Sequence, residues 1–236
     1  MSQAGVPPAQ GLIVAVDGPS GAGKSTVTRL LAERLGYLYI DTGAMFRAVA
    51  LMVKRAGISP DDEVGLAELC SRLSIALERD DGCCRVLANG EDVTADIRTP
   101  EISLLTSRVS ARKVVRDFLL ALQREMGSQG GVVLEGRDIG TVVFPQAQVK
   151  FFLSASAEER GRRRYLELQA KGETVTLEQT IAEVKARDEH DRQRTHAPLC
   201  KAADAVEIDS SGLTIPEVVA AMDQLVRERQ QAVSQG

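Results

Sequence analysis

The chain of 236 residues contains no tryptophan, and aromatic residues make up only 3% of it. Proteins that bind single-stranded nucleic acid stack bases on aromatic side chains along a basic groove. This sequence has neither a basic stripe nor a set of rings, and its 29 basic and 33 acidic side chains give a net charge of −4. We therefore expect no nucleic-acid partner.

Long apolar segments and paired cysteines are also missing. No apolar run approaches the ~18 residues that a membrane-spanning helix needs. Residues 1–11 lack the basic and apolar stretches of a signal peptide, so we expect a mobile N-terminal tail. The four cysteines show neither a C-x-x-C pair nor zinc-finger spacing, which is typical of reduced thiols. We expect a cytoplasmic protein with no membrane contact, and we assign no metal role to Cys70, Cys83, Cys84 and Cys200.

Short apolar strands alternate with helical patterns. Residues 12–16 (LIVAV) form a β-branched run, and a glycine-rich loop and a segment of helical periodicity follow it. This alternation predicts βαβ units, and therefore an α/β fold with a parallel sheet flanked by helices. Further strands are expected at residues 37–40, 132–134, 149–153 and 205–208, with a helix at 44–56.

Two segments interrupt this alternation. Residues 58–98 carry 10 acidic and 4 basic side chains and include an Asn89-Gly90 turn, which indicates a hairpin in a small inserted subdomain. Residues 154–199 contain two helices, the first opened by Ser156 and Glu159 and the second by Thr176 and Gln179. The core domain is then expected to comprise residues 12–57, 99–153 and 200–236.

The glycine-rich loop matches G-x-x-x-x-G-K-[ST] between a strand and a helix. In such a P-loop the backbone amides converge on phosphate oxygens, the lysine reaches the β- and γ-phosphates, and the hydroxyl ligates Mg²⁺. A plain glycine turn that caps a helix is the alternative, but the complete motif makes it a poor one. Asp17, at the strand end, is a second candidate for the metal site beside Ser25. The predicted ATP contacts are Gly18, Pro19, Ser20, Gly21, Ala22, Gly23, Lys24, Ser25 and Thr26.

Absent motifs and three further segments restrict the class of P-loop protein. The guanine-reading N/T-K-x-D motif and the L-S-G-G-Q motif of transporter ATPases are both absent, which favours a small-molecule kinase. VDGPSGAGKST, DTGAMFRAVA, EGRDIGTVVFP and RDEHDRQR occur in this order between residues 12 and 209. Together they resemble the bacterial cytidylate kinases, a branch of the P-loop nucleoside monophosphate kinases. The resemblance implies an NMP-binding subdomain at 58–98 and a lid with substrate-binding helices at 154–199.

The resemblance also implies the acceptor site. Arg47 would hold the acceptor phosphate, since a guanidinium binds phosphate through two parallel bonds, and Asp138 would accept from the cytosine amine, a donor that uracil lacks. Ser107 and Arg116 would contact the same base. They lie nine residues apart, on opposite faces of a straight helix, so we expect a helix break near Ser110. The full implied CMP-binding set is Asp41, Thr42, Arg47, Ser107, Arg116, Arg137, Asp138, Arg187, Asp191 and Arg194.

Charged residues at helical spacing complete the expectations. Arg187, Asp191 and Arg194 share one helix face, where the resemblance favours sugar, base and phosphate contacts over a solvated ion-pair ladder. Arg160, Arg163 and Arg164 share another face and are, with Lys24, the predicted catalytic residues. A solvated surface remains the alternative for these three lid arginines.

The resemblance thus implies an enzyme of the EC 2.7.4 type that acts as a monomer. With Mg²⁺, it would transfer the γ-phosphoryl group of ATP to CMP or dCMP and yield ADP and CDP or dCDP. Two alternatives stay open at this point. One is a P-loop kinase for UMP or another small acceptor, and the other is a nucleotide-dependent regulator without catalytic activity.

Overall fold

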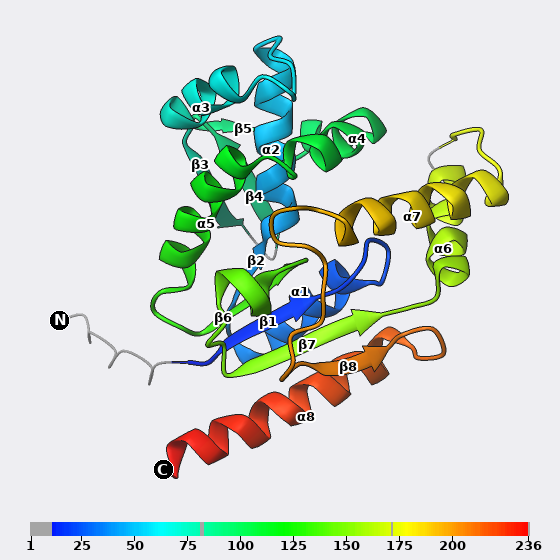
Figure 1. Ribbon diagram of the computed structural model, residues 1–236. Helices are drawn as coiled ribbons and strands as arrows, with labels where there is room; N and C mark the ends of the chain where they lie inside the picture. The colour runs from blue at the N-terminus through cyan, green and yellow to red at the C-terminus, as the bar shows by residue number, and fades with distance from the viewer. Residues whose placement is uncertain (1–10, 81–82, 171, 236) are drawn as a thin grey trace.

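The computed structural model describes residues 11–80, 83–170 and 172–235. Its centre is a five-stranded parallel sheet in the order β2-β6-β1-β7-β8, which confirms the predicted α/β fold (Figure 1). Of the expected tail, residues 1–10 lie outside the described residues. The strands are β1 (Ile13–Asp17), β2 (Leu38–Asp41), β6 (Val132–Gly136), β7 (Val149–Ser154) and β8 (Val206–Asp209).

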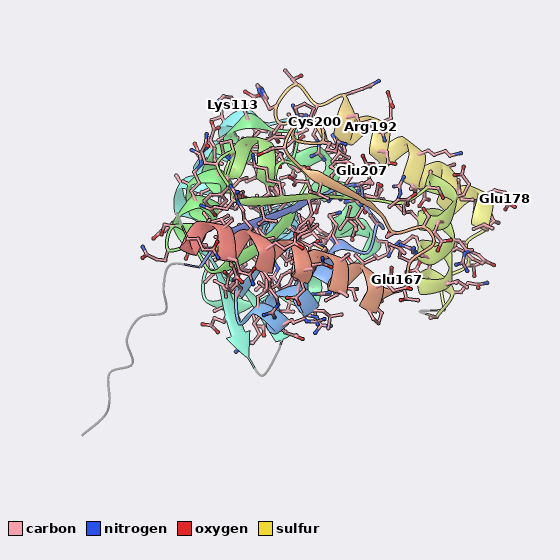
Figure 2. The ribbon with its side chains drawn as sticks, turned by 90° about the horizontal axis from the view of Figure 1, so that it is seen from below. Lys113, Glu167, Glu178, Arg192, Cys200 and Glu207 are labelled. Carbon is pink, nitrogen blue, oxygen red and sulfur yellow. The ribbon has the colours of Figure 1, made fainter. Side chains whose placement is uncertain are left out.

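Alternate side chains of β1 belong to two different hydrophobic clusters, because successive side chains of a strand point to opposite faces. Val14 and Val16 pack with α1 (Lys24–Leu35) and α8 (Ile215–Ser234), and Figure 2 shows α8 lying across this face of the sheet. Ala15 packs with α2 (Thr42–Arg55) and α5 (Lys113–Gly127). The sheet is therefore covered on both faces, as a parallel sheet requires.

The strand register places the candidate polar residues at one edge of the sheet. Asp17 is paired with Gly136, and Asp41 is paired with Glu135, at the carboxyl ends of their strands. Ligands of open α/β sheets bind outside these carboxyl ends. The P-loop after β1, the start of α2 after β2 and the Arg137-Asp138 segment after β6 consequently lie next to one another.

The inserted segment carries α3 (Glu63–Arg72), the strands β3 (Ile75–Asp80), β4 (Cys83–Ala88) and β5 (Glu91–Asp92), and the short helix η1 (Asp96–Arg98). The three strands form a second, antiparallel sheet. Asn89 and Gly90 both have positive φ angles, 50° and 81°, and form the predicted hairpin turn between β4 and β5. Apolar side chains of this segment pack in one cluster with those of α2, α4 (Pro100–Val109) and α5.

The predicted helix break is present. α4 (Pro100–Val109) ends at its C-cap residue Ser110, and α5 starts at Lys113, so Ser107 and Arg116 lie on separate helices. The predicted element ends differ from the observed ones by a residue or two elsewhere. The first turn of α2, for example, begins at Thr42 because the Asp41 side chain caps it by accepting from the amide of Ala44.

Helices α6 (Ala157–Ala170) and α7 (Leu177–Arg192) form a pair beside the P-loop (Figure 1). Figure 2 shows the pair, labelled at Glu167 and Glu178, at the opposite end of the molecule from Lys113. Thr176 and Gln179 form the expected capping box of α7. Arg194 was expected on the same helix face as Arg187, but α7 ends at Arg192, so Arg194 lies in the segment that follows.

No helix within the described ranges is long and apolar enough to cross a bilayer.

Gly161 allows α6 and α7 to approach closely, since a Cβ atom on it would lie 2.4 Å from Cγ1 and 2.9 Å from Cα of Ile181. We predict that Gly161→Ala lowers the free energy of unfolding by about 1–3 kcal/mol, because overpacking forces the helices apart. Gly212→Ala is the matched control, since its added Cβ would meet no atom within 4 Å. Equal melting temperatures of the two variants would contradict this account of the helix pair.

Candidate active site

The nine predicted P-loop residues run from the end of β1 into the first turn of α1. Two glycines explain the path of this loop. Gly23 caps α1 with a φ of 87°, which disfavours other residues. A Cβ on Gly18 would lie 2.0 Å from the carbonyl oxygen of Leu153 on β7. The loop therefore lies directly on the neighbouring strand.

The ammonium of Lys24 is held under this loop. It is buried and donates to the carbonyl oxygen of Pro19 at 2.7 Å. Burial, followed by the nearby charge of Arg137, lowers the pKa of Lys24, although Glu135 and Asp17 oppose the change. A phosphate group bound here would supply the negative charge that favours the protonated lysine.

Glu135 is a functional candidate that the sequence analysis missed. Its buried carboxylate accepts from the hydroxyl of Tyr39, and the Ser25 hydroxyl of the P-loop is near enough to act on it and lower its pKa. Burial, and then the charge of Asp41 on the adjacent strand, raise the pKa of Glu135, while Lys24 lowers it. The available signal was the position of the glutamate at the end of an apolar strand, directly before the Gly-Arg-Asp sequence.

Asp17, a candidate for the metal site in the sequence analysis, contacts the backbone of the segment after β6. Its two carboxylate oxygens accept the amides of Ile139 and Gly140, each at 2.8 Å. Burial raises the pKa of Asp17 to about 6, even though these two amides favour the charged form. In this structure Asp17 thus anchors the segment after β6 to the end of β1.

Arginines surround a single buried carboxylate at the predicted acceptor site. Asp191 accepts from Nε of Arg137 at 2.9 Å and also pairs with Arg194. Burial acts to raise the pKa of Asp191, but Arg137 and Arg194 outweigh it and hold the pKa below its usual value. The predicted residues from β6 and from α7 are therefore brought together.

Arg187 adds a further positive charge to this group. Burial, and then repulsion by Arg137, lower the pKa of Arg187 to about 10, with Arg47 and Arg194 acting in the same direction. Among the described residues, the buried Nε atoms of Arg47, Arg187 and Arg194 have no hydrogen-bond partner. The cluster therefore has more positive charge and more donors than its own carboxylates satisfy.

The first turn of α2 lies between this cluster and Glu135. Thr42 donates through Oγ1 to the carbonyl oxygen of Glu135 at 2.6 Å, so its hydroxyl is engaged with the backbone. Arg47 lies 3.8 Å from Asp41, a loose ion pair. Arg47, one turn further along α2, has donors left for a ligand.

The proposed base-reading residues form a pair in a groove. Arg116 pairs with Asp138, and its guanidinium lies 5.4 Å from the ring centre of Phe46. These three residues line a groove of about 250 Å³. Ser107 is not in contact with the pair: its Oγ lies 3.3 Å from Nδ1 of His190 on α7, which bridges α4 and α7.

The three lid arginines have different environments. Arg160 is 3% exposed and donates twice to Asp188, at 2.9 and 2.5 Å, and once to the carbonyl oxygen of Ser20 at 3.1 Å. Nη1 of Arg163 lies 3.9 Å from the position of a Cβ on Gly23, beside the P-loop. Arg164 pairs with Glu167 on its own helix at 2.9 Å.

The sequence model of the family described as cytidylate kinase matches residues 14–228. The chain is 69% identical over 223 residues to the cytidylate kinase of Geobacter sulfurreducens, covering 94% of this chain and 96% of that protein. It is 63% identical over 220 residues to the cytidylate kinase of Syntrophotalea carbinolica, covering 93% and 94%. The chain belongs to the cytidylate kinase family.

Among solved structures, the shikimate kinase of Bacteroides thetaiotaomicron aligns with a TM-score of 0.48 and 13% identity, over 92% of this chain and 98% of that chain. This likeness is too distant to bear on substrate or mechanism.

The Arg160–Asp188 pair joins both lid helices to the P-loop. We predict that Asp188→Asn lowers the free energy of unfolding by about 3–5 kcal/mol, because it leaves the Arg160 guanidinium buried without its counter-charge. Arg162→Met is the control, since Arg162 is exposed and pairs with Glu159 of its own helix, where such pairs contribute less than about 1 kcal/mol. Equal thermal unfolding of the two variants would show that the buried pair does not hold the lid.

Proposed function

We propose that this protein transfers the γ-phosphoryl group of ATP to CMP or dCMP, yielding ADP and CDP or dCDP. One observation carries the proposal: a P-loop and a partly buried arginine cluster with excess positive charge lie side by side at the carboxyl edge of one sheet. The P-loop suits the triphosphate of the donor. The cluster of Arg47, Arg137, Arg187 and Arg194 suits the phosphate of an acceptor.

Base recognition rests on Asp138 and Arg116. In the structure these two side chains satisfy each other, so a base that binds between them must replace their contact. Cytosine can do so, because its amine donates to a carboxylate while its ring nitrogen and carbonyl accept from a guanidinium. Asp191, held between Arg137 and Arg194, would then accept from a sugar hydroxyl, and Ser107 would join the base once α4 moves away from His190.

The residues near the P-loop fit Mg²⁺ as the companion of ATP. The ion usually takes one or two protein oxygens together with substrate phosphates, and no set of three or more His, Cys, Asp or Glu side chains within the described ranges could hold a metal ion. The Ser25 hydroxyl and the Glu135 carboxylate would hold it, with Glu135 in place of the Asp17 that the sequence suggested. A bound ion would neutralise charge on the phosphate oxygens.

Positioning and charge neutralisation are then sufficient for catalysis. The acceptor phosphate is an anionic nucleophile at neutral pH, so no general base is needed. Lys24 and Arg163 lie where they can neutralise the transferring group, whereas Arg160 holds the lid and Arg164 faces Glu167. Closure of residues 154–199 would exclude water, which would otherwise accept the phosphoryl group.

The remaining assignments belong to the same proposal. One chain supplies every residue named above, which supports action as a monomer. Residues 58–98 would move with the acceptor, residues 154–199 would close over the donor, and the rest of the chain from residue 12 would form the fixed core. We place the reaction in the cytoplasm, where both nucleotide substrates are made.

A coupled assay of ADP formation tests the proposed function directly. We expect turnover with CMP and dCMP to exceed turnover with UMP, AMP and GMP, because uracil has no amine for Asp138 and the purine rings of AMP and GMP are larger than the single ring of cytosine. Lys24→Ala should lose most of the kcat, which controls for a contaminating kinase. Equal turnover of all monophosphates by the wild-type protein would refute cytosine recognition.

Asp138→Asn should reduce the preference for CMP over UMP by roughly ten- to a hundredfold in kcat/KM, since an amide can also donate to the uracil carbonyl and base contacts contribute about 1–3 kcal/mol. Asp117→Asn is the matched control, because Asp117 lines the same groove but is exposed and pairs with Lys113. If both substitutions leave the ratio of CMP to UMP turnover unchanged, Asp138 does not read the base.

A further inference from the structure

The groove that contains Arg116 and Asp138 also has a buried amide, that of Gln123, in its wall. Lys113, Arg116, Asp117, Leu120 and Gln123 face it from α5, spaced by three or four residues as one helix face. Lys113 and Asp117 pair with each other at its exposed end. Gln123 is the buried polar residue of this face, with 3% of its surface exposed.

The amide of Gln123 is not used by the fold. Its Nε2 atom is buried and has no hydrogen-bond partner among the described residues. Two backbone carbonyls of the groove wall already have another donor, because Arg124 donates to the carbonyl oxygens of Val142 at 2.9 Å and Val143 at 3.1 Å. A buried amide donor without a partner is costly, so a partner supplied from the groove is the expected compensation.

We propose that the Gln123 amide hydrogen-bonds the pyrimidine ring of the bound acceptor nucleotide. The proposal rests on the proposed function, and it adds a residue to the base site. Gln123 is seven positions, or about two turns, beyond Arg116, so both side chains reach the groove from the same side. The ring that contacts Arg116 and Asp138 therefore lies within the same groove as the Gln123 amide.

The chemistry of an amide separates its role from that of Asp138. A carboxylate only accepts, so it distinguishes the cytosine amine from the uracil carbonyl. An amide carries one acceptor and two donors, and rotation by half a turn lets it match either base. Gln123 thus contributes affinity for pyrimidines in general, while Asp138 selects cytosine among them.

Gln123→Met tests the proposal, because methionine keeps the length of the side chain and removes its polar atoms. We expect the Kd and KM of CMP and of UMP each to rise about tenfold, with the CMP/UMP ratio, kcat and the KM of ATP unchanged. The melting temperature of the ligand-free variant should not fall, since an unpaired buried donor is lost. Gln224→Met on the exposed surface of α8 is the matched control and should change none of these values.

An unchanged Kd for both nucleotides would overturn the proposal, and so would a lower melting temperature with an unchanged Kd, because Gln123 would then be structural. A second measurement needs no variant. In the wild-type protein, CMP should shift the side-chain amide resonances of Gln123, whereas ribose 5-phosphate, which has no base, should not. Shifts of equal size with both ligands would also overturn it.

These outcomes are distinguishable from failure of the proposed function. If the wild-type protein neither binds nor phosphorylates CMP, the base site itself is wrong. If the wild-type protein uses CMP, Asp138→Asn changes the CMP/UMP ratio and Gln123→Met leaves the Kd unchanged, only the assignment of Gln123 fails.

Discussion

Uncompensated positive charge at the carboxyl edge of the sheet is the constraint on which the rest of this structure depends. Arg137 and Arg194 share the single carboxylate of Asp191, and Arg187 lies close enough to them that repulsion and burial lower its pKa to about 10. Such a group is stable only while α7 and the segment after β6 hold it together. A bound phosphate would relieve the repulsion between these arginines. The free energy that their repulsion costs in the empty site therefore favours the binding of an anion.

The acidic residues nearby have separate tasks. Asp17 is saturated by two backbone amides and fixes the chain after β6, while Glu135 faces a hydroxyl of the P-loop. Both lie within reach of the Lys24 charge, and burial raises the pKa of each. In the proposed function, this difference in partners, backbone amides against side-chain hydroxyls, would let Glu135 and not Asp17 share its oxygens with a metal ion.

The sequence predicted those parts of the site that depend on local pattern. The P-loop and the turn at Asn89-Gly90 each follow from a few consecutive residues. The break between Ser107 and Arg116 followed from helix geometry once the resemblance implied that both contact one base. Contacts between distant strands could not be predicted in this way. Glu135 meets Asp41 only through the register of β6 with β2, and the burial of Arg160 depends on Asp188 of the next helix. The helical spacing of Arg160, Arg163 and Arg164 therefore could not distinguish their roles, although their environments differ.

The ion pairs of the insert, residues 58–98, explain how its many acidic side chains are accommodated. Its carboxylates pair with arginines outside the cleft: Asp61 with Arg108 and Arg112, and Glu91 and Asp96 with Arg55. Exposed pairs of this kind contribute little to stability, but they keep negative charge on the outer surface of the insert. An overall charge of −4 is thus compatible with two polyanionic substrates, because these acidic groups are balanced locally and the partly buried arginines of the site are not. The distribution of charge, and not its sum, decides which ligands this fold can bind.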